Sequence, residues 1–238
     1  MDDLRELNRR VCRHVWELAT VKGGQAGIGA LSPRLLLPSY SSGGARLSEQ
    51  EARFVYTDVL NGTNLFYSVE TPTKEQYSFS GASSRSASSD LTIYERLAAD
   101  GEFRALANVE LKAHNCTAEA VAKDLQKLFR EDVDGIWFHV FAKTQAGSTI
   151  DTLMAKFCAA FRGKVPKFSM NADYAAMSSN KILFVFCVYE EGWAILKSMD
   201  LSANPDPKTF FAFHATYDPA ATPPIKANND WEALCRGS

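Results

Sequence analysis

The sequence predicts a single-core protein with an α/β fold of the mixed, α+β kind; one observation supports the single core and a second supports the fold class. First, the 238 residues include 46% hydrophobic and 23% charged residues, a balance typical of a protein with one sizeable core. Second, strand-like and helix-like spacings of apolar residues follow one another from residue 48 onward. No apolar run approaches the ~20 residues that a membrane-spanning helix needs, so we expect no membrane association.

The individual elements follow from apolar spacing and from capping and turn residues. Helices are expected over residues 4–18, 48–61, 117–130 and 149–161, with a last helical piece at 231–234. The second helix begins with a capping box in which Ser48 is the N-cap and Glu51 is its partner. Strands are expected over 65–71, 76–81, 90–95, 103–113, 135–142, 181–189 and 209–216. The Ser-rich linker 81–89 is expected to be mobile.

These elements suggest three parts of the chain. Residues 1–47 comprise a helix and an irregular Gly-, Ser- and Pro-rich segment, residues 48–216 form the core domain, and residues 217–238 are a Pro-rich tail. The five cysteines are scattered and include no Cys-x-x-Cys pair, and the first residues are acidic and amphipathic. Together these features predict a cytoplasmic protein without a disulfide framework.

The segment "LANVELKAHN", residues 106–115, carries polar side chains in alternation with apolar ones. Asp100-Gly101 is the strongest hairpin signal in the chain, and a turn there places Asp90 opposite Glu110. Because side chains alternate along strands, one face of this hairpin is apolar. The other face then carries Asp90, Thr92, Asn108, Glu110 and Lys112.

Two carboxylates and an ammonium on one sheet face suit a metal-dependent site. Neighbouring carboxylates raise each other's pKa unless a cation lies between them. Mg²⁺ takes oxygen ligands, including carboxylates, and acidifies bound water. Lys112 projects beside Glu110 and could neutralise negative charge on a phosphate during attack.

This pattern resembles the PD-(D/E)XK nuclease superfamily over roughly residues 48–142. Asp90 is followed after 19 residues by Glu110-Leu111-Lys112, with a helix and strands before this motif and a helix and strand after it. The residue before Asp90 is Ser89 instead of the proline in the motif's name. The resemblance implies a restriction-endonuclease-like core, with a central mixed sheet flanked by helices, and phosphodiester hydrolysis that depends on Mg²⁺ or Mn²⁺.

Position by position, the resemblance makes Asp90, Glu110 and the Leu111 carbonyl metal ligands and Lys112 the catalytic lysine. Glu51 falls where many members keep an accessory acid. The alternative for the whole pattern is a solvated sheet face with a cross-strand Lys–Glu pair. For Glu51, the capping box is the better explanation, and Glu70 is a further candidate acid.

Nucleic-acid contacts are expected from cations near this site. Lys123, Lys127 and Arg130 follow helical spacing after the catalytic strand, and Arg85 lies in the Ser-rich linker. Cations close to a helix C-terminus also stabilise the helix dipole, which is the simpler explanation for the helical set.

The sequence therefore predicts a nuclease that acts on nucleic acid, with DNA favoured over RNA, in defence or repair. It leaves open a homodimer or a larger complex. A non-catalytic module that binds nucleic acid or protein on the same fold is the alternative.

Overall fold

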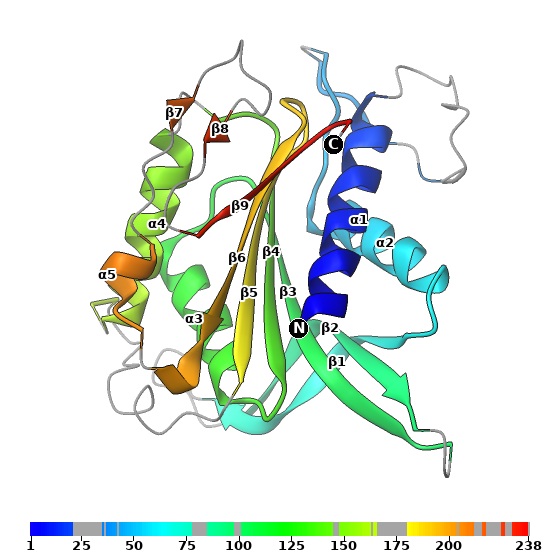
Figure 1. Ribbon diagram of the computed structural model, residues 1–238, viewed down its shortest axis with the longest axis vertical. Coiled ribbons are helices and arrows are strands. Elements are labelled where there is room, and N and C mark those ends of the chain that lie inside the picture. Colours follow the sequence, from blue (N-terminus) through cyan, green and yellow to red (C-terminus); the bar gives the residue numbers. More distant parts are fainter. Residues whose placement is uncertain are drawn as a thin grey trace.

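In the computed structural model, a seven-stranded mixed sheet lies between two layers of helices (Figure 1). Helices α1 and α2 cover one face of the sheet, and α3, α4 and α5 lie on the other side. The residues that the structure describes are 1–20, 35, 37–41, 43–77, 85–97, 101–144, 148–162, 164–165, 180–203, 205–211, 216–217, 225–226 and 230–237. These observations confirm the predicted class, a mixed α/β protein with a central mixed sheet flanked by helices.

The helices and strands have the following bounds. The helices are α1 Asp2–Thr20, α2 Glu49–Asn61, α3 Ala118–Arg130, α4 Ser148–Phe161 and α5 Pro207–Phe210, with a 3-10 turn η2 at Leu201–Ala203. The strands of the main sheet are β1 Phe66–Tyr77, β2 Arg85–Arg96, β3 Phe103–Ala113, β4 Asp134–Phe141, β5 Lys181–Val188, β6 Trp193–Asp200 and β9 Glu232–Cys235. A separate pair is formed by β7 Thr216–Tyr217 and β8 Ile225–Lys226.

The strand order explains why the sheet is mixed. It runs β1-β2-β3-β4-β5-β6-β9, and β1, β2 and β3 are antiparallel neighbours. The pairs β3–β4 and β4–β5 are parallel, and parallel neighbours need a crossover connection. Helix α3 lies between β3 and β4 in sequence, and α4 lies between β4 and β5.

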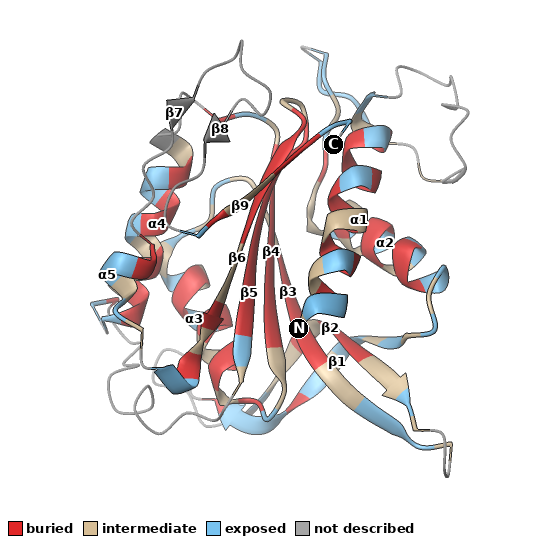
Figure 2. Ribbon diagram, viewed as in Figure 1, coloured by how far each residue is buried: buried red, intermediate tan, exposed pale blue. Residues whose placement is uncertain are grey.

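Two apolar layers hold the helices to the sheet. Strands β4 and β5 are buried along nearly their whole length (Figure 2), as expected for strands that are covered on both faces. On the α1 and α2 side, the buried side chains include Val11, Tyr56, Val109 and Phe138. On the α3 and α4 side, they include Leu125, Trp137, Phe157 and Phe184. Among the described residues, no helix is both long and apolar enough to cross a membrane.

The predicted register of the central hairpin is confirmed over its inner part. Leu91 pairs with Val109, Thr92 pairs with Asn108, and Ile93 pairs with Ala107. The register then shifts between Ile93 and Tyr94, so the outer part of the hairpin contains a bulge that the sequence did not predict. In the predicted turn, Gly101 has a φ of +74°, whereas Asp100 lies outside the described residues.

The Ser48–Glu51 capping box is also confirmed, and it fixes the start of α2. The predictions for 65–71 and 76–81 merge into one strand, β1, as far as Tyr77; residues 78–81 lie outside the described part. Within the linker predicted to be mobile, residues 85–89 instead belong to β2, because they pair with β1.

Two predictions near the C-terminus were wrong. Residues 207–210 form the short helix α5 and not the start of a strand, because Asp206 caps the helix and Pro207 occupies its first position. The segment around 231–234 is not helical: Glu232–Cys235 form β9, which pairs with β6. Strand β6 was not predicted. Residues 212–215 of the expected strand lie outside the described part.

Candidate functional site

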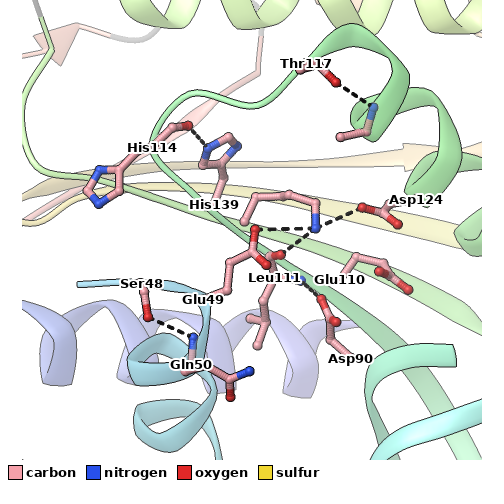
Figure 3. Close-up of polar contacts among 12 residues, drawn as sticks. Ser48, Glu49, Gln50, Asp90, Glu110, Leu111, His114, Thr117, Asp124 and His139 are labelled. Atoms are coloured by element: carbon pink, nitrogen blue, oxygen red, sulfur yellow. Dashed lines mark hydrogen bonds and ion pairs between the residues drawn. The ribbon is translucent and has the colours of Figure 1, made fainter. Parts of the chain in front are cut away.

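Asp90 lies at the point where β2 separates from β3. The pairing of these strands begins at Leu91 and Val109, just beyond Asp90. The carboxylate of Asp90 accepts a hydrogen bond from the Leu111 backbone N–H at 2.7 Å, so a side chain spans the gap between the strands (Figure 3). The other oxygen of Asp90 lies 3.3 Å from the guanidinium of Arg53 on α2. Asp90 is therefore anchored beside the Glu110-Leu111-Lys112 motif.

Glu110 is fully buried under α3. Its Oε2 accepts a hydrogen bond from Lys127 Nζ at 2.6 Å, and its Oε1 has no hydrogen-bond partner within the described part of the chain. Burial, followed by the negative charges of Asp124 and Asp90, raises the pKa of Glu110, and Lys127 only partly opposes this effect. Glu110 is thus a carboxyl group whose negative charge is incompletely compensated.

Lys112 is held by acids from two helices. Its Nζ lies 2.9 Å from Asp124 Oδ2 on α3 and 3.6 Å from Glu49 Oε1 on α2 (Figure 3). The same ammonium donates to the Leu111 carbonyl at 2.9 Å. Burial alone would lower the pKa of Lys112, but the neighbouring acids outweigh burial and raise it, so this side chain is cationic at neutral pH.

Helix α3 contributes two charged side chains, Asp124 and Lys127, to the site. The sequence alone did not identify these two residues as a pair. Lys127 Nζ lies close to three oxygens: Glu110 Oε2 at 2.6 Å, the Ser88 carbonyl at 2.9 Å and Asp124 Oδ1 at 3.0 Å. Asp124 occupies a core position of the helix, between Val121 and Leu128. A charged residue at apolar spacing was the signal that could have identified it.

The buried charges of the site balance one another. Three acids, Asp90, Glu110 and Asp124, face the three bases Arg53, Lys112 and Lys127, and each of these side chains is less than one fifth exposed. Glu49 and Glu70 add negative charge at the rim, where they are about half exposed. The network is therefore neutral inside and acidic at its edge.

The two glutamates at the start of α2 have different roles. Glu51 accepts a hydrogen bond from the Ser48 backbone N–H at 2.8 Å and also contacts the Ser48 hydroxyl. These bonds complete the capping box, and they outweigh burial in lowering the pKa of Glu51. Glu49, and not Glu51, is the acid of α2 that approaches Lys112.

Glu70 reaches the site through Arg53. One guanidinium nitrogen of Arg53 lies 2.7 Å from Glu70 and 3.3 Å from Asp90, so a single cation joins the two acids. Glu70 has a φ of +49°, a left-handed conformation that costs energy for a residue with a side chain. Such strained residues persist where the surrounding structure holds them, often at functional sites.

The cations predicted to contact phosphate have different surroundings. Lys127 is buried in the network, so its ammonium is not available to an external phosphate. Arg130 lies over the Tyr77 ring at 5.1 Å and 3.6 Å from Glu75, and Lys123 is exposed on α3. For Arg85, the backbone belongs to β2 but the side chain lies outside the described part. Phosphate contact therefore stays a prediction for Lys123, Arg130 and Arg85.

His139 on β4 lies next to the charged network. His139 pairs with Lys112 across the β3–β4 ladder, and its ring stacks on Phe141 with centroids 4.1 Å apart. Its Nε2 lies 2.6 Å from the His114 carbonyl oxygen, and burial lowers its pKa to about 3. His139 is therefore a neutral, packed side chain.

The oxygen atoms of Asp90 in β2 and of Glu110 and Leu111 in β3 fit a hard divalent ion in chemical type. Asp90 and Glu110 supply carboxylate oxygens, including the unpartnered Oε1 of Glu110, and Leu111 supplies a carbonyl. Mg²⁺ commonly uses one or two carboxylates and keeps several waters. Among the described residues, no three His, Cys, Asp or Glu side chains are grouped closely enough to hold a metal by themselves.

Comparisons with known proteins found no match: no protein-family model, no curated protein and no solved structure matches this chain. A functional assignment therefore has to come from the geometry around Asp90, Glu110 and Lys112.

Proposed function

We propose that this protein is a nuclease that hydrolyses phosphodiester bonds with Mg²⁺ or Mn²⁺, and that DNA is favoured over RNA as its substrate. The observation that carries the proposal is the position of Asp90, which binds the Leu111 N–H and so lies beside Glu110 and Lys112. The order of elements supports it as well: α2, the antiparallel strands β1 to β3, α3 and then β4 parallel to β3. This is the order expected for a restriction-endonuclease-like core of the PD-(D/E)XK kind.

Asp90, Glu110 and the Leu111 carbonyl would hold the ion, with water completing its shell. When bound, the ion would acidify a water molecule and neutralise charge on the phosphoryl group. The raised pKa of Glu110 fits this role, because the charged carboxylate lacks compensating positive charge in the structure described.

Lys112 would supply a fixed positive charge to the reacting phosphate. Asp124 and Glu49 keep its ammonium protonated and restrict its position. A cation held in place before the reaction stabilises developing negative charge without further reorganisation. Asp124 would act as a positioning residue, because it contacts Lys112 and not the substrate.

The second candidate is a non-catalytic module that binds nucleic acid or protein on the same fold. The closed network favours it: three buried acids are matched by three buried bases, and Lys127 already neutralises one oxygen of Glu110. In that case, the charged groups would connect α2 and α3 to the sheet and would perform no chemistry.

A cleavage panel separates the two candidates. Single- and double-stranded DNA and RNA are incubated with the protein and Mg²⁺ or Mn²⁺, with EDTA as the metal-free control. We expect the wild type to cleave at least one substrate, and Lys112→Ala to be at least about 100-fold slower. Lys143→Ala, at a side chain that is 70% exposed and away from the network, is the matched control and should cleave like the wild type. Cleavage that Lys112→Ala leaves unchanged would contradict the assignment.

A further inference from the structure

Two phenylalanine rings are exposed at the outer end of the central hairpin. The Phe66 and Phe103 side chains are 42% and 55% exposed, and their ring centroids lie 4.8 Å apart. Phe66 pairs with Tyr94, and Phe103 pairs with Arg96 on the same strand. Because Tyr94 and Arg96 are two residues apart, both rings lie on one face of the sheet.

This aromatic pair lies on the face that carries the proposed active site. Thr92 precedes Tyr94 by two residues and donates a hydrogen bond to Asn108 at 2.7 Å, and Asn108 precedes Glu110 by two residues. The seven residue-to-residue steps from Phe103 to Glu110 correspond to about 23 Å of β3. The turn end of β2 and β3 extends away from the helices and is mostly exposed or half-buried (Figures 1 and 2).

Arg96 supplies positive charge next to the two rings. It is exposed and has no acidic partner among the described residues, whereas Arg104, on the opposite face, pairs with Glu95. Phe66 and Arg96 also line a hollow of about 800 Å³ beside the loop that follows α2, together with Tyr67 and with Glu95, the partner of Arg104. An uncompensated cation beside aromatic rings suits a ligand that presents both phosphates and flat bases.

We infer that Phe66, Phe103 and Arg96 form a stacking platform for unpaired bases, so that single-stranded nucleic acid is the ligand of this face. The inference rests on the proposed function, because the platform lies on the same sheet face as Glu110. Bases would stack on the two rings, which every base can do, and Arg96 would contact the backbone. A second protein chain could also pack against the two rings, but it would need an acidic side chain to pair with Arg96.

The inference is tested by fluorescence anisotropy with labelled oligo-dT and oligo-U of about 20 nucleotides. The measurements are made in EDTA, so that cleavage plays no part. We expect the wild type to bind single strands more tightly than a duplex of the same length. The double variant Phe66→Ala/Phe103→Ala should bind at least about tenfold more weakly, whereas Phe103→Trp should retain binding. Arg96→Ala should reduce the salt dependence of log K by about 0.7, the value for one phosphate contact.

Two matched controls remove side chains of the same kinds outside the platform. Phe54→Ala removes an aromatic side chain on α2 that is 59% exposed, and Arg104→Ala removes the arginine on the other face. Both should bind like the wild type. Equal losses in these controls, no single-strand binding by the wild type, or a dimer that the double variant abolishes would each overturn the inference. If the protein binds single strands but cleaves no substrate, the platform is supported and the nuclease proposal is wrong. If it cleaves only duplex and the platform variants have no effect, the nuclease proposal is supported and the platform is wrong.

Discussion

On the sheet face that contacts α3 and α4, neighbouring strands carry opposite kinds of side chains. Strand β3 presents the polar side chains Asn108, Glu110 and Lys112, and on α3 Lys127 pairs with Glu110 and Asp124 pairs with Lys112. Strands β4 and β5 present an aromatic layer that packs around Phe157 of α4, formed by Trp137, Phe184 and Phe186. Both regions are buried, but only the aromatic layer gains from leaving water.

The comparison separates side chains that stabilise the fold from side chains that need another explanation. Burying an ion pair costs several kcal/mol per ion, and the attraction between the charges only roughly offsets that cost. An apolar replacement of similar volume is often neutral or stabilising. The charged network is therefore weak evidence for stability, and the proposed metal site would be a separate reason for the charges at Glu110 and Lys112.

The largest effect is expected in the aromatic layer. Phe157 contacts Trp137, Phe184 and Phe186 and also stacks on Phe211 at 5.0 Å. Phe157→Ala removes these contacts and leaves a cavity, so the free energy of unfolding should fall by about 3–5 kcal/mol. Urea denaturation measures the change. A loss below about 1 kcal/mol would mean that this layer does not stabilise the fold.

A similar loss is expected when one partner of the charged network is removed, but here a second substitution should reverse it. Lys127→Met leaves Glu110 buried with its charge uncompensated, which should cost about 3–5 kcal/mol. The double variant Lys127→Met/Glu110→Leu removes both charges and should return to within about 1 kcal/mol of the wild type. If the unfolding free energy of the double variant were as low as that of Lys127→Met, the contrast between the charged network and the aromatic layer would be wrong.

The protein should lose stability in acid because of His139, which lies between the charged network and the aromatic layer. Burial lowers the pKa of His139 to about 3, whereas an unfolded histidine titrates near about 6.5. Between these values the unfolded chain binds the extra proton, so stability that is present above about pH 6.5 is lost as the pH falls. From pH 7 to pH 5, His139 should account for a loss of about 2 kcal/mol. Denaturation of His139→Phe at both pH values should show a correspondingly smaller difference, and an unchanged difference would exclude this source.

The smallest effect concerns backbone strain at Glu70, within β1. Glycine adopts the φ of +49° at Glu70 without the penalty that a Cβ brings. Glu70→Gly should therefore be more stable than Glu70→Ala by about 1 kcal/mol, and the loss of the contact with Arg53 is common to both. Thermal unfolding of the two variants measures the difference, and equal stabilities would show that the backbone relaxes there.

The parts of the fold that were predicted correctly carry local signals. The capping box at Ser48 located α2, alternating residues located β3, and the turn residues with the apolar period set the inner register of the hairpin. Each signal depends on residues close together in sequence. Asp90, Glu110 and Lys112 could be associated before the structure was known because the hairpin brings them together.

The parts that were missed depend on distant contacts. Residues 232–235 have no strand signal of their own, and they form β9 because β6 offers a free edge. Asp124 and Lys127 look like an ordinary i, i+3 pair on a helix, and only the packing of α3 on β3 places them beside Glu110. Arg53 joins Asp90 and Glu70 only because α2 brings its side chain to the middle of the paired strands β1 and β2.

Calorimetric titration with Mg²⁺ and Mn²⁺ tests the central claim most directly, namely that Asp90 and Glu110 share a divalent ion. The wild type should bind the ion saturably and gain thermal stability from it. Asp90→Asn, which retains the size of the side chain, should lose both effects, whereas Lys143→Ala, far from the network, should retain them. A wild type that binds neither ion, or an Asp90→Asn variant that binds as tightly as the wild type, would contradict the account.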